Sequence, residues 1–253
     1  MAEEQAPRPM ISVQGLYKSF GRYDVLRGID LDVPEGSTCV ILGGSGSGKT
    51  VLMKHMIGLL KPDKGRVLVD GEDLVPMDAQ ELERVRRKFG MVFQAAALFD
   101  SMTVYENVAF PLKEHRKVSE DEARALVREK LAIVGLSNVE EKYPADLSGG
   151  MRKRVGLARA IILDPKIVLY DEPTTGLDPI TTDSVDEMIL TAKRELGVTS
   201  VVISHDIASS FKVADNLAFL YQGQIVAQGP PQSLRDHPHP GLRTFLQTWF
   251  GKN

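Results

Sequence analysis

Short apolar runs separated by polar turns dominate the first part of the chain. Between Ile11 and Leu42 these runs are broken by turn-forming segments at residues 20–22 and 33–36, a pattern typical of antiparallel strands. Residues 65–71 predict a further strand, and Asp78 followed by Glu81 predicts the start of a helix with a capping box. The pattern therefore predicts an antiparallel β layer at the N-terminal side of the chain.

Two later apolar runs end abruptly in ionisable residues. Residues 167–172 form a β pattern that closes on Asp171 and Glu172, and residues 200–206 form another that reaches His205. Runs without polar alternation are typical of strands buried on both faces, which occur in parallel sheets. Because ligands bind at the carboxyl ends of such strands, these residues are candidates for a functional site.

A helical pattern occupies the middle of the chain. Ser119 followed by Glu122 predicts an N-terminus, and Gly135 ends the helix. Apolar residues recur between them at helical spacing, which indicates core packing: Ala123, Leu126, Val127, Leu131 and Val134. We predict one domain over residues 1–253, with a core formed by residues 10–92 and 164–250 and a helical lobe formed by residues 93–163.

A glycine-rich loop joins the apolar run 38–42 to the helical pattern 51–56. It matches G-x-x-x-x-G-K-[ST] with Gly43, Gly44, Ser45, Gly46, Ser47, Gly48, Lys49 and Thr50. Such a loop aims backbone N–H groups at phosphate oxygens, and the following helix N-terminus adds partial positive charge. Lys49 is predicted to reach the β- and γ-phosphates and Thr50 to ligate Mg²⁺. A glycine-rich turn that binds nothing would not need this Lys-Thr pair.

A second helix N-terminus is predicted at LSGGM, residues 147–151. Ser148, Gly149 and Gly150 precede the helical stretch 151–163, which makes them a further candidate anion site as well as an N-cap. One chain cannot easily aim two helix N-termini at one γ-phosphate. Two copies arranged head to tail can each lend this segment to the other's phosphate loop.

The ionisable residues at the ends of the two buried strands have distinct predicted roles. Asp171 would hold Mg²⁺ through water, and Glu172 would polarise the water that attacks the γ-phosphate. His205 is a candidate γ-phosphate contact. Paired acids at the end of a strand more often belong to a solvated turn, and a lone histidine there more often has a structural role. In this sequence the acids and the histidine follow a phosphate loop, which favours the functional interpretation.

Together these motifs resemble the nucleotide-binding subunit of ABC transporters, from about Ile11 to about Phe250. The family pattern then places a Walker A loop at 43–50, a Q-loop at 93–94, a signature at 147–151, a Walker B strand at 167–172, a D-loop at 175–178 and a switch histidine at 205. The resemblance implies an α/β P-loop NTPase core with an N-terminal antiparallel β layer and an inserted α-helical lobe. ATP and Mg²⁺ are the implied ligands.

The resemblance also implies roles for individual residues. Gln94 would contact Mg²⁺ and act in catalysis with Glu172 and His205, and Asp178 would belong to the nucleotide site. Phe20 would stack on adenine, with Tyr17 and Tyr23 as neighbouring alternatives.

Other segments resemble one branch of the family, the ATPase of the bacterial Mla system. These segments are residues 97–99, 107–112 and 178–181, together with Met151. The branch implies phospholipid transport across the bacterial envelope by an ATPase dimer. Its implied partners are a polytopic permease and an MCE lipid-binding protein, and its implied location is peripheral, at the cytoplasmic face of the inner membrane.

Two other functions are alternatives to phospholipid transport. The same ATPase could instead drive an importer or exporter of small polar solutes. An ABC ATPase of DNA repair or translation would carry long coiled coils or a second cassette, and neither pattern occurs in this sequence.

The composition of the chain excludes several classes of protein. The chain has 253 residues, of which 43% are hydrophobic and 26% charged, with a formal net charge of −3. The near-neutral charge argues against a nucleic-acid partner, and no apolar run approaches the roughly 18 residues of a membrane span. Cys39 is the one cysteine, which excludes an intrachain disulfide and a cysteine-rich metal site.

Two segments near Gln94 have open interpretations. The stretch 94–112 is apolar for a connection, so it either forms a partner surface or folds into the core of the lobe. We predict that Leu98, Phe99 and Val104 include contacts to a permease. The basic run at residues 84–88 is predicted to be a solvated helix face.

Overall fold

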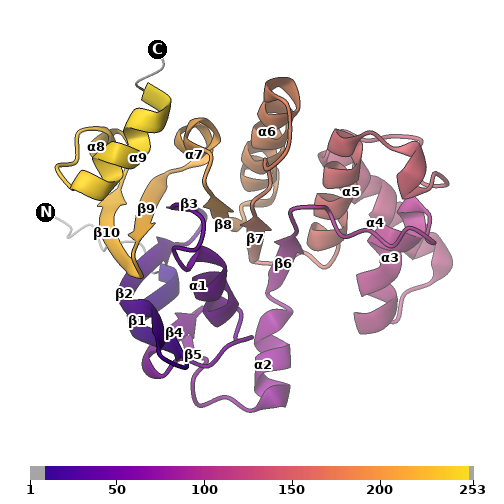
Figure 1. Cartoon of the computed structure of the whole chain (residues 1–253). Helices are drawn as coiled ribbons and strands as arrows, with labels where there is room; N and C mark the ends of the chain where they lie inside the picture. Colours follow the sequence, from indigo (N-terminus) through magenta and orange to yellow (C-terminus); the bar gives the residue numbers. More distant parts are fainter. Residues whose placement is uncertain (1–8, 251–253) are drawn as a thin grey trace, which may run out of the picture.

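The computed structural model describes residues 9–250, whose strands form a six-stranded sheet and a four-stranded sheet (Figure 1). The larger sheet has the order β10 (Gln224–Gly229), β9 (Asn216–Tyr221), β3 (Thr38–Leu42), β8 (Thr199–Ser204), β7 (Ile167–Asp171) and β6 (Phe89–Val92). Its strands pair in parallel except for the antiparallel pair of β9 and β10. The phosphate-loop strand β3 therefore lies inside a mainly parallel sheet.

The smaller sheet is antiparallel and confirms the predicted β layer. Its order is β2 (Tyr23–Pro34), β1 (Pro9–Phe20), β4 (Lys64–Val69) and β5 (Glu72–Asp73). The short runs expected before Leu42 join into two long strands, β1 and β2, because register shifts within their pairing absorb the irregular positions.

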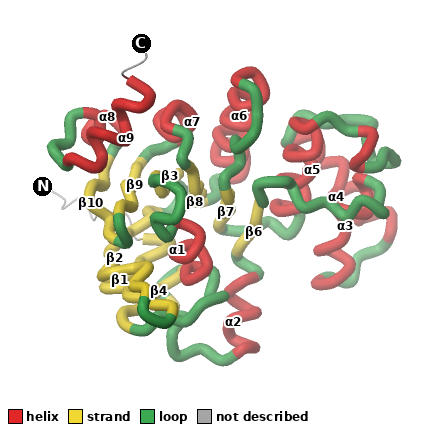
Figure 2. Tube along the Cα trace, viewed as in Figure 1, coloured by secondary structure: helices red, strands yellow, loops and turns green. Residues whose placement is uncertain are grey.

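The helices lie on both sides of the larger sheet. They are α1 (Lys49–Met56), α2 (Ala79–Arg86), α3 (Val104–His115), α4 (Glu120–Ile133), α5 (Gly149–Ile161), α6 (Pro179–Leu196), α7 (Ile207–Val213), α8 (Pro231–Arg235) and α9 (Pro240–Phe250), with a 3₁₀ turn at Pro144–Asp146. Helices α3, α4 and α5 gather at one end of the molecule, where Figure 2 shows helices and loops but no strand. This arrangement matches the predicted helical lobe.

Alternate residues of the central strands belong to two different cores. In β3, Cys39 and Ile41 pack with α1 and the smaller sheet, whereas Val40 and Leu42 pack with the side that carries the lobe, α6 and α7. Successive side chains of a strand point to opposite faces, so a fully apolar run is what burial on both faces requires. Cys39 is 1% exposed, and burial raises the pKa of its thiol to about 12.

The predicted helix starts are confirmed by their caps. Asp78 accepts a hydrogen bond from the Glu81 backbone N–H at 2.9 Å, and the Glu81 carboxylate accepts one from the Asp78 N–H at 3.0 Å. Ser119 accepts from the Glu122 N–H at 3.3 Å and begins α4, which ends before Gly135 at a φ of +70°. The apolar stripe of α4 packs into the core on the lobe side.

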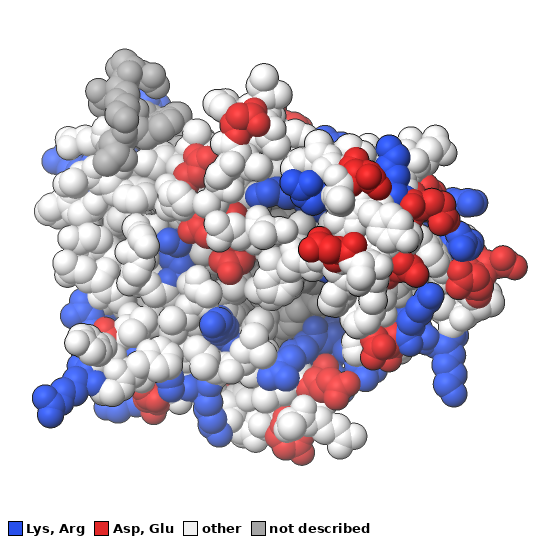
Figure 3. Space-filling view, turned by 45° about the vertical axis from the view of Figure 1, so that its right-hand side comes forward, with Lys and Arg blue, Asp and Glu red and all other residues white. Residues whose placement is uncertain are grey.

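The surface carries charges of both signs. On the face shown in Figure 3, lysine, arginine and carboxylate side chains are interspersed, and neither sign forms a continuous patch there. This distribution agrees with the near-neutral net charge.

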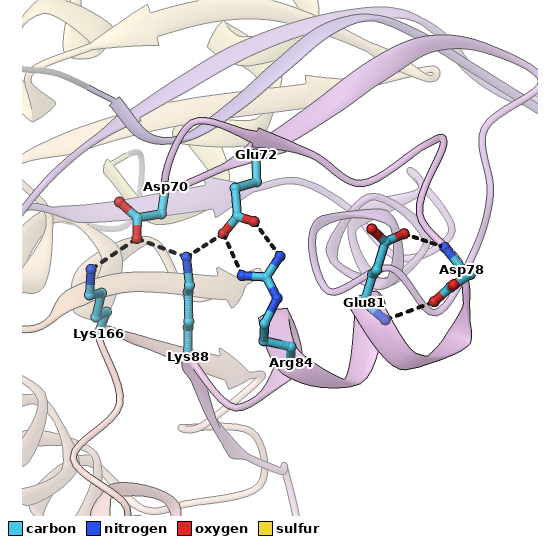
Figure 4. Close-up of polar contacts among 7 residues, drawn as sticks. All are labelled: Asp70, Glu72, Asp78, Glu81, Arg84, Lys88 and Lys166. Atoms are coloured by element: carbon cyan, nitrogen blue, oxygen red, sulfur yellow. Dashed lines mark hydrogen bonds and ion pairs between the residues drawn. The ribbon is translucent and has the colours of Figure 1, made fainter.

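The basic run at residues 84–88 is more than the solvated face that we predicted. Arg84 binds Glu72, while Lys88 lies 2.8 Å from both Asp70 and Glu72 (Figure 4). Lys166, from the loop before β7, also reaches Asp70 at 2.9 Å. The prediction missed this cluster because its acids, Asp70 in the β4–β5 turn and Glu72 at the start of β5, come close to the basic run only in the folded chain.

The cluster predicts a pH-dependent part of the stability. Hydrogen bonds from Lys88 and then Lys166 lower the pKa of Asp70 to about 2, and those from Arg84 and then Lys88 lower the pKa of Glu72 to about 2. A depressed carboxyl pKa stabilises the fold above the unfolded pKa, and this stabilisation is lost as the pH falls from about 4.5 to about 2. We expect Lys88→Met to flatten the decline of Tm over that interval, measured by thermal melting.

A matched control for this prediction is Arg87→Met. Arg87 also pairs with a carboxylate, Glu83, at 3.0 Å, but both side chains are more than half exposed, so solvent screens the pair. The slope of Tm against pH should be the same in this control as in the wild type. Equal slopes in Lys88→Met and the control would contradict the role of the cluster.

Candidate functional site

The phosphate loop leaves β3 at the carboxyl edge of the larger sheet and leads into α1. Gly46 and Gly48 adopt φ values of +75° and +105°, a region that glycine enters without strain. A Cβ at Gly43 would lie 2.5 Å from the Leu220 carbonyl oxygen, which is closer than real contacts allow. The loop therefore requires glycine both for its backbone angles and for its approach to β9.

A cavity of about 710 Å³ opens beside this loop and brings most of the predicted site together. The predicted residues in its lining are Gly44, Ser45, Gly46, Ser47, Gly48, Lys49, Thr50, Gln94, Glu172 and His205. Gly43, at the start of the loop, is not part of this lining. The buried Ser47 hydroxyl has no hydrogen-bond partner among the described residues, so a phosphate oxygen in the loop would satisfy it.

Lys49 is the buried cation of the cavity. Its side chain is 7% exposed, and Nζ donates to the carbonyl oxygens of Gly43 at 2.7 Å and Gly44 at 3.1 Å. Nζ also lies 3.5 Å from Glu172 Oε1. The ammonium group is thus fixed within the phosphate loop and beside the carboxylate at the end of β7.

Glu172 follows β7 in an uncommon backbone conformation. Its φ is +49°, which costs a non-glycine residue about 1–2 kcal/mol, while its backbone N–H is held by the Ile203 carbonyl oxygen at 2.9 Å. The carboxylate lies 2.7 Å from His205 Nδ1 and accepts a hydrogen bond from Thr175 Oγ1 at 3.1 Å. The carboxylate is consequently held at the cavity from three sides, by Lys49, His205 and Thr175.

The predicted Mg²⁺ ligands offer a suitable set of oxygen donors. Thr50 and Gln94 line the cavity, whereas Asp171 lies just outside its lining, so a contact through water is the expected mode for Asp171. Burial, followed by the charge of Glu172, raises the pKa of Asp171, and Lys49 opposes this rise. A hydroxyl, an amide and a carboxylate beside the phosphate loop therefore fit a divalent cation.

The signature and Asp178 of the D-loop lie next to each other, outside the lining of the cavity, whereas Thr175 at the other end of the D-loop is part of that lining. Ser148 is the exposed N-cap of α5, and Asp178 is the N-cap of α6. A Cβ at Gly150 would lie 3.5 Å from Thr181 Cγ2, in the first turn of α6. The structure thus groups Ser148, Gly149, Gly150 and Asp178 on one surface, separate from the phosphate loop of the same chain.

Phe20 is placed differently from the other predicted residues. It ends β1, is 46% exposed, and lies with its ring centroid 5.6 Å from Lys18 Nζ, but it does not line the cavity. Of the alternatives, Tyr23 is 80% exposed. Stacking of Phe20 on adenine stays a prediction.

Sequence reasoning missed four residues of the cavity lining: Val25, Val51, Thr175 and Phe245. Thr175 lies in the predicted D-loop, but no sequence pattern links its hydroxyl with the Glu172 carboxylate, to which it donates a hydrogen bond. Phe245 comes from α9 and packs on Phe219 of β9 at 5.2 Å between ring centroids. No local pattern connects Phe245 with the phosphate loop.

The loop after Gln94 divides between core and surface. Val104 is fully buried at the start of α3, so our prediction that it contacts a permease is wrong. Leu98 packs partly against the same core, whereas Phe99 is 43% exposed. The buried Asn107 side chain accepts a hydrogen bond from the Phe99 N–H at 2.8 Å and donates to the Phe99 carbonyl oxygen at 3.1 Å, which fixes this loop on α3.

A family model described as ABC transporter matches residues 26–175. The chain belongs to the ABC transporter family. As a cassette of this family it is an ATP-hydrolysing transport ATPase, with ATP and Mg²⁺ as its ligands. Among residues 9–250, none of the helices of the cassette has both the length and the apolar character needed to cross a membrane.

Two relatives cover nearly all of the cassette. It is 45% identical over 236 residues to the "probable ribonucleotide transport ATP-binding protein mkl" of Mycobacterium leprae, covering 93% of this chain and 68% of that protein. It is 39% identical over 243 residues to the "intermembrane phospholipid transport system ATP-binding protein MlaF" of Escherichia coli K12, covering 96% of this chain and 90% of that protein.

A solved structure agrees with the fold of the cassette. The ATP-binding cassette MJ0796, in a dimeric post-hydrolysis state bound to ADP and Pi, superposes with a TM-score of 0.78 at 31% sequence identity. The match covers 88% of this chain and 99% of that chain. The predicted fold class is therefore confirmed.

Proposed function

We propose that the cassette is the ATPase subunit of a bacterial phospholipid transporter, working as a head-to-tail dimer on a polytopic permease. An MCE lipid-binding protein would join the complex through the permease, which would hold the cassette at the cytoplasmic face of the inner membrane. The observation that carries the lipid assignment is the match to the phospholipid transport ATPase of E. coli, which extends over 90% of that protein.

A second candidate is transport of a polar solute. It is favoured by the higher identity, 45%, to a mycobacterial protein whose name refers to ribonucleotide transport, although this chain covers 68% of that protein. The structure of the cassette does not distinguish phospholipid transport from solute transport, because the transported substrate contacts the permease.

The proposed chemistry follows from the positions of the side chains around the cavity. Bound Mg²⁺ would neutralise charge on the phosphate oxygens, and Thr50, Gln94 and Asp171 are the residues suited to hold it. The phosphate loop and Lys49 would hold the β- and γ-phosphates. Glu172 would take a proton from the attacking water, and His205, 2.7 Å from Glu172, would orient the carboxylate and contact the γ-phosphate.

The separation of the signature from the phosphate loop supports a dimeric site. Ser148 is exposed at the N-terminus of α5 and does not line the cavity of its own chain. In a head-to-tail pair, each exposed N-terminus would face the γ-phosphate held by the other copy, where its partial charge stabilises an anion. Two ATP molecules would therefore be enclosed by two copies.

A groove between α2 and the lobe offers a docking place for the permease. Its volume is about 520 Å³, and three exposed aromatic side chains line it: Phe93, Phe99 and Phe110. Phe99 and Phe110 pack together at 5.2 Å between ring centroids, with Glu83 and Arg87 at the rim. A cytoplasmic helix of the permease with an apolar face would bury these rings, and the groove adjoins the loop that carries Gln94.

We expect Phe99→Glu to abolish most assembly with the permease. A carboxylate buried without a partner in an apolar interface costs several kcal/mol, and each 1.4 kcal/mol is about tenfold in affinity. The yield of permease on the tagged cassette should fall by at least about tenfold, while ATP binding and Tm of the isolated cassette stay unchanged. Co-purification from membranes, followed by quantitative immunoblotting, measures the yield.

The control for the groove is Tyr143→Glu. Tyr143 is a comparably exposed aromatic of the lobe, 47% against 43% for Phe99, but it lies outside the groove. Its variant should assemble normally. Normal assembly of Phe99→Glu would place the permease elsewhere on the cassette.

The lipid assignment is tested on the intact complex. The tagged wild-type cassette is purified from bacterial membranes, and bound proteins and small molecules are identified by mass spectrometry. A permease, an MCE protein and phospholipid are the expected products. A solute-binding protein without bound phospholipid, together with ATPase stimulation by a ribonucleotide, would favour the second candidate.

A further inference from the structure

The loop that carries Gln94 has a backbone that alanine does not favour. Ala96 and Ala97 follow Gln94 closely, and their φ values are +60° and +48°. A single non-glycine residue in this left-handed region is uncommon, and two in succession need support from outside the loop. Neither alanine has a polar side chain that could supply such support.

The support comes from Arg159 on α5. Its Nη1 donates to the Ala97 carbonyl oxygen and its Nη2 to the Ala96 carbonyl oxygen, both at 2.7 Å. The guanidinium group presents paired donors in a fixed plane, so it can hold two successive carbonyl groups in one orientation. Burial lowers the pKa of Arg159, and within the described part of the chain its hydrogen bonds go to these carbonyls.

Helix α5 also contacts the loop directly. A Cβ at Gly156, one turn before Arg159, would lie 3.2 Å from Ala96 Cβ, so there is little free space between the helix and the loop. Ala96 itself is 1% exposed. The helix that starts at Ser148 therefore touches the loop of Gln94 through both close packing and hydrogen bonds.

Arg159 lines the groove, and the loop that it holds continues to the nucleotide cavity. Arg159 and Ala97 line the groove that contains Phe99, whereas Gln94 lines the nucleotide cavity. Only Ala95 and Ala96 separate Ala97 from Gln94 along the chain. A shift of α5 or of a helix seated in the groove consequently reaches the Arg159 contacts before it reaches Gln94.

We propose that Arg159 is a positioning residue for ATP hydrolysis, which holds Ala96 and Ala97 in the left-handed conformation and thereby fixes Gln94 at the nucleotide cavity. Its place in the groove makes it the link through which an occupant of the groove adjusts Gln94. This second part rests on the proposed function, whereas the positioning of Gln94 does not.

The test compares Arg159→Ala and Arg159→Lys with the wild type, in the isolated cassette and in the membrane complex. We expect Arg159→Ala to lower kcat by about tenfold, because a small misplacement of a catalytic group has effects of this order. The KM for ATP should change by less than about twofold, since the phosphate loop is untouched. Arg159→Lys keeps the charge but loses the paired donors, so its loss should be intermediate.

A matched control is Arg154→Ala. Arg154 also lies on α5 and donates to the Val134 carbonyl oxygen at 3.1 Å and to Ser184 Oγ at 2.6 Å, but it lines neither the groove nor the nucleotide cavity. Its bonds hold the end of α4 and α6 instead of the Gln94 loop. We expect this variant to lower Tm without the fall in kcat per folded molecule.

A rescue separates positioning from a general structural role. The Ala97 methyl group is exposed, so Ala97→Gly removes no packing, and glycine adopts a positive φ freely. In the Arg159→Ala background we expect Ala97→Gly to recover several-fold of the lost kcat. Absence of this recovery, or an Arg159→Ala variant with the same kcat as Arg154→Ala, would overturn the proposal.

The two parts of the proposal fail in distinguishable ways. If the wild-type cassette purifies without a permease, the proposed function fails, and the variants still test positioning in the isolated cassette. If the complex assembles and Arg159→Ala retains wild-type kcat in it, positioning by Arg159 is wrong while the transporter assignment stands.

Discussion

Replacement of the carboxylate at the end of β7, Glu172→Gln, is expected to lower ATP turnover by roughly 10²–10⁴-fold, the usual contribution of a general acid–base group. The amide has nearly the same shape, but it cannot accept a proton from the attacking water. The phosphate loop and Lys49 are unchanged, so the variant should still bind ATP and accumulate as an ATP-bound dimer. Turnover is measured by phosphate release, and the dimer by size-exclusion chromatography with ATP.

The control for this prediction is Glu187→Gln on the exposed side of α6. Glu187 pairs with Lys212 at 2.9 Å and does not line the nucleotide cavity, so its variant should hydrolyse ATP normally. Near-normal turnover of Glu172→Gln in the purified transporter would remove Glu172 from its proposed role. Loss of ATP binding in that variant would show instead that its ion pair with Lys49, at 3.5 Å, shapes the phosphate loop.

The second large effect is expected at the signature, where Ser148→Arg should block closure of the dimer and nearly abolish hydrolysis. The arginine side chain would occupy the space that the partner's γ-phosphate needs. Loss of the Ser148 cap on α5 costs about 1 kcal/mol, which a folded cassette tolerates. Ser119→Arg is the matched control, because Ser119 is likewise an exposed N-cap whose Oγ accepts a backbone hydrogen bond, at the start of α4.

Mixing of variants tests the head-to-tail geometry. When Ser148→Arg and Lys49→Ala cassettes pair, one composite site carries both defects and the other carries neither. ATPase activity of the mixture should therefore exceed that of either variant alone. Activity no higher than in the separate variants would count against the geometry. Strict cooperativity between the sites would give the same result, so nucleotide binding to the mixed dimer is measured as the control.

Much of the fold was predictable because the relevant signals are local. The fully apolar strands β3, β7 and β8 required a sheet buried on both faces, and Gly43 to Thr50 placed the loop at its edge. Caps at Asp78 and Ser119 marked helix starts, since these hydrogen bonds form between residues three positions apart.

What the sequence did not show depends on contacts between distant segments. Val104 and Phe99 are both apolar residues of one stretch, and only the packing of α3 decides that the first is buried and the second exposed. Phe245 reaches the nucleotide cavity because α9 folds back over β9, which no pattern near residue 245 predicts. The positive φ values of Ala96 and Ala97 are likewise imposed by Arg159 from another helix.

The single cysteine has a practical consequence for measuring motion in this cassette. Cys39 lies inside β3 with 1% of its surface exposed, and burial raises the pKa of its thiol to about 12, so little thiolate forms near neutral pH. Maleimide dyes and spin labels should therefore leave the folded protein untouched until a surface cysteine is introduced. Distances across a closing pair of copies can then be recorded by fluorescence transfer or electron resonance on an otherwise native sequence.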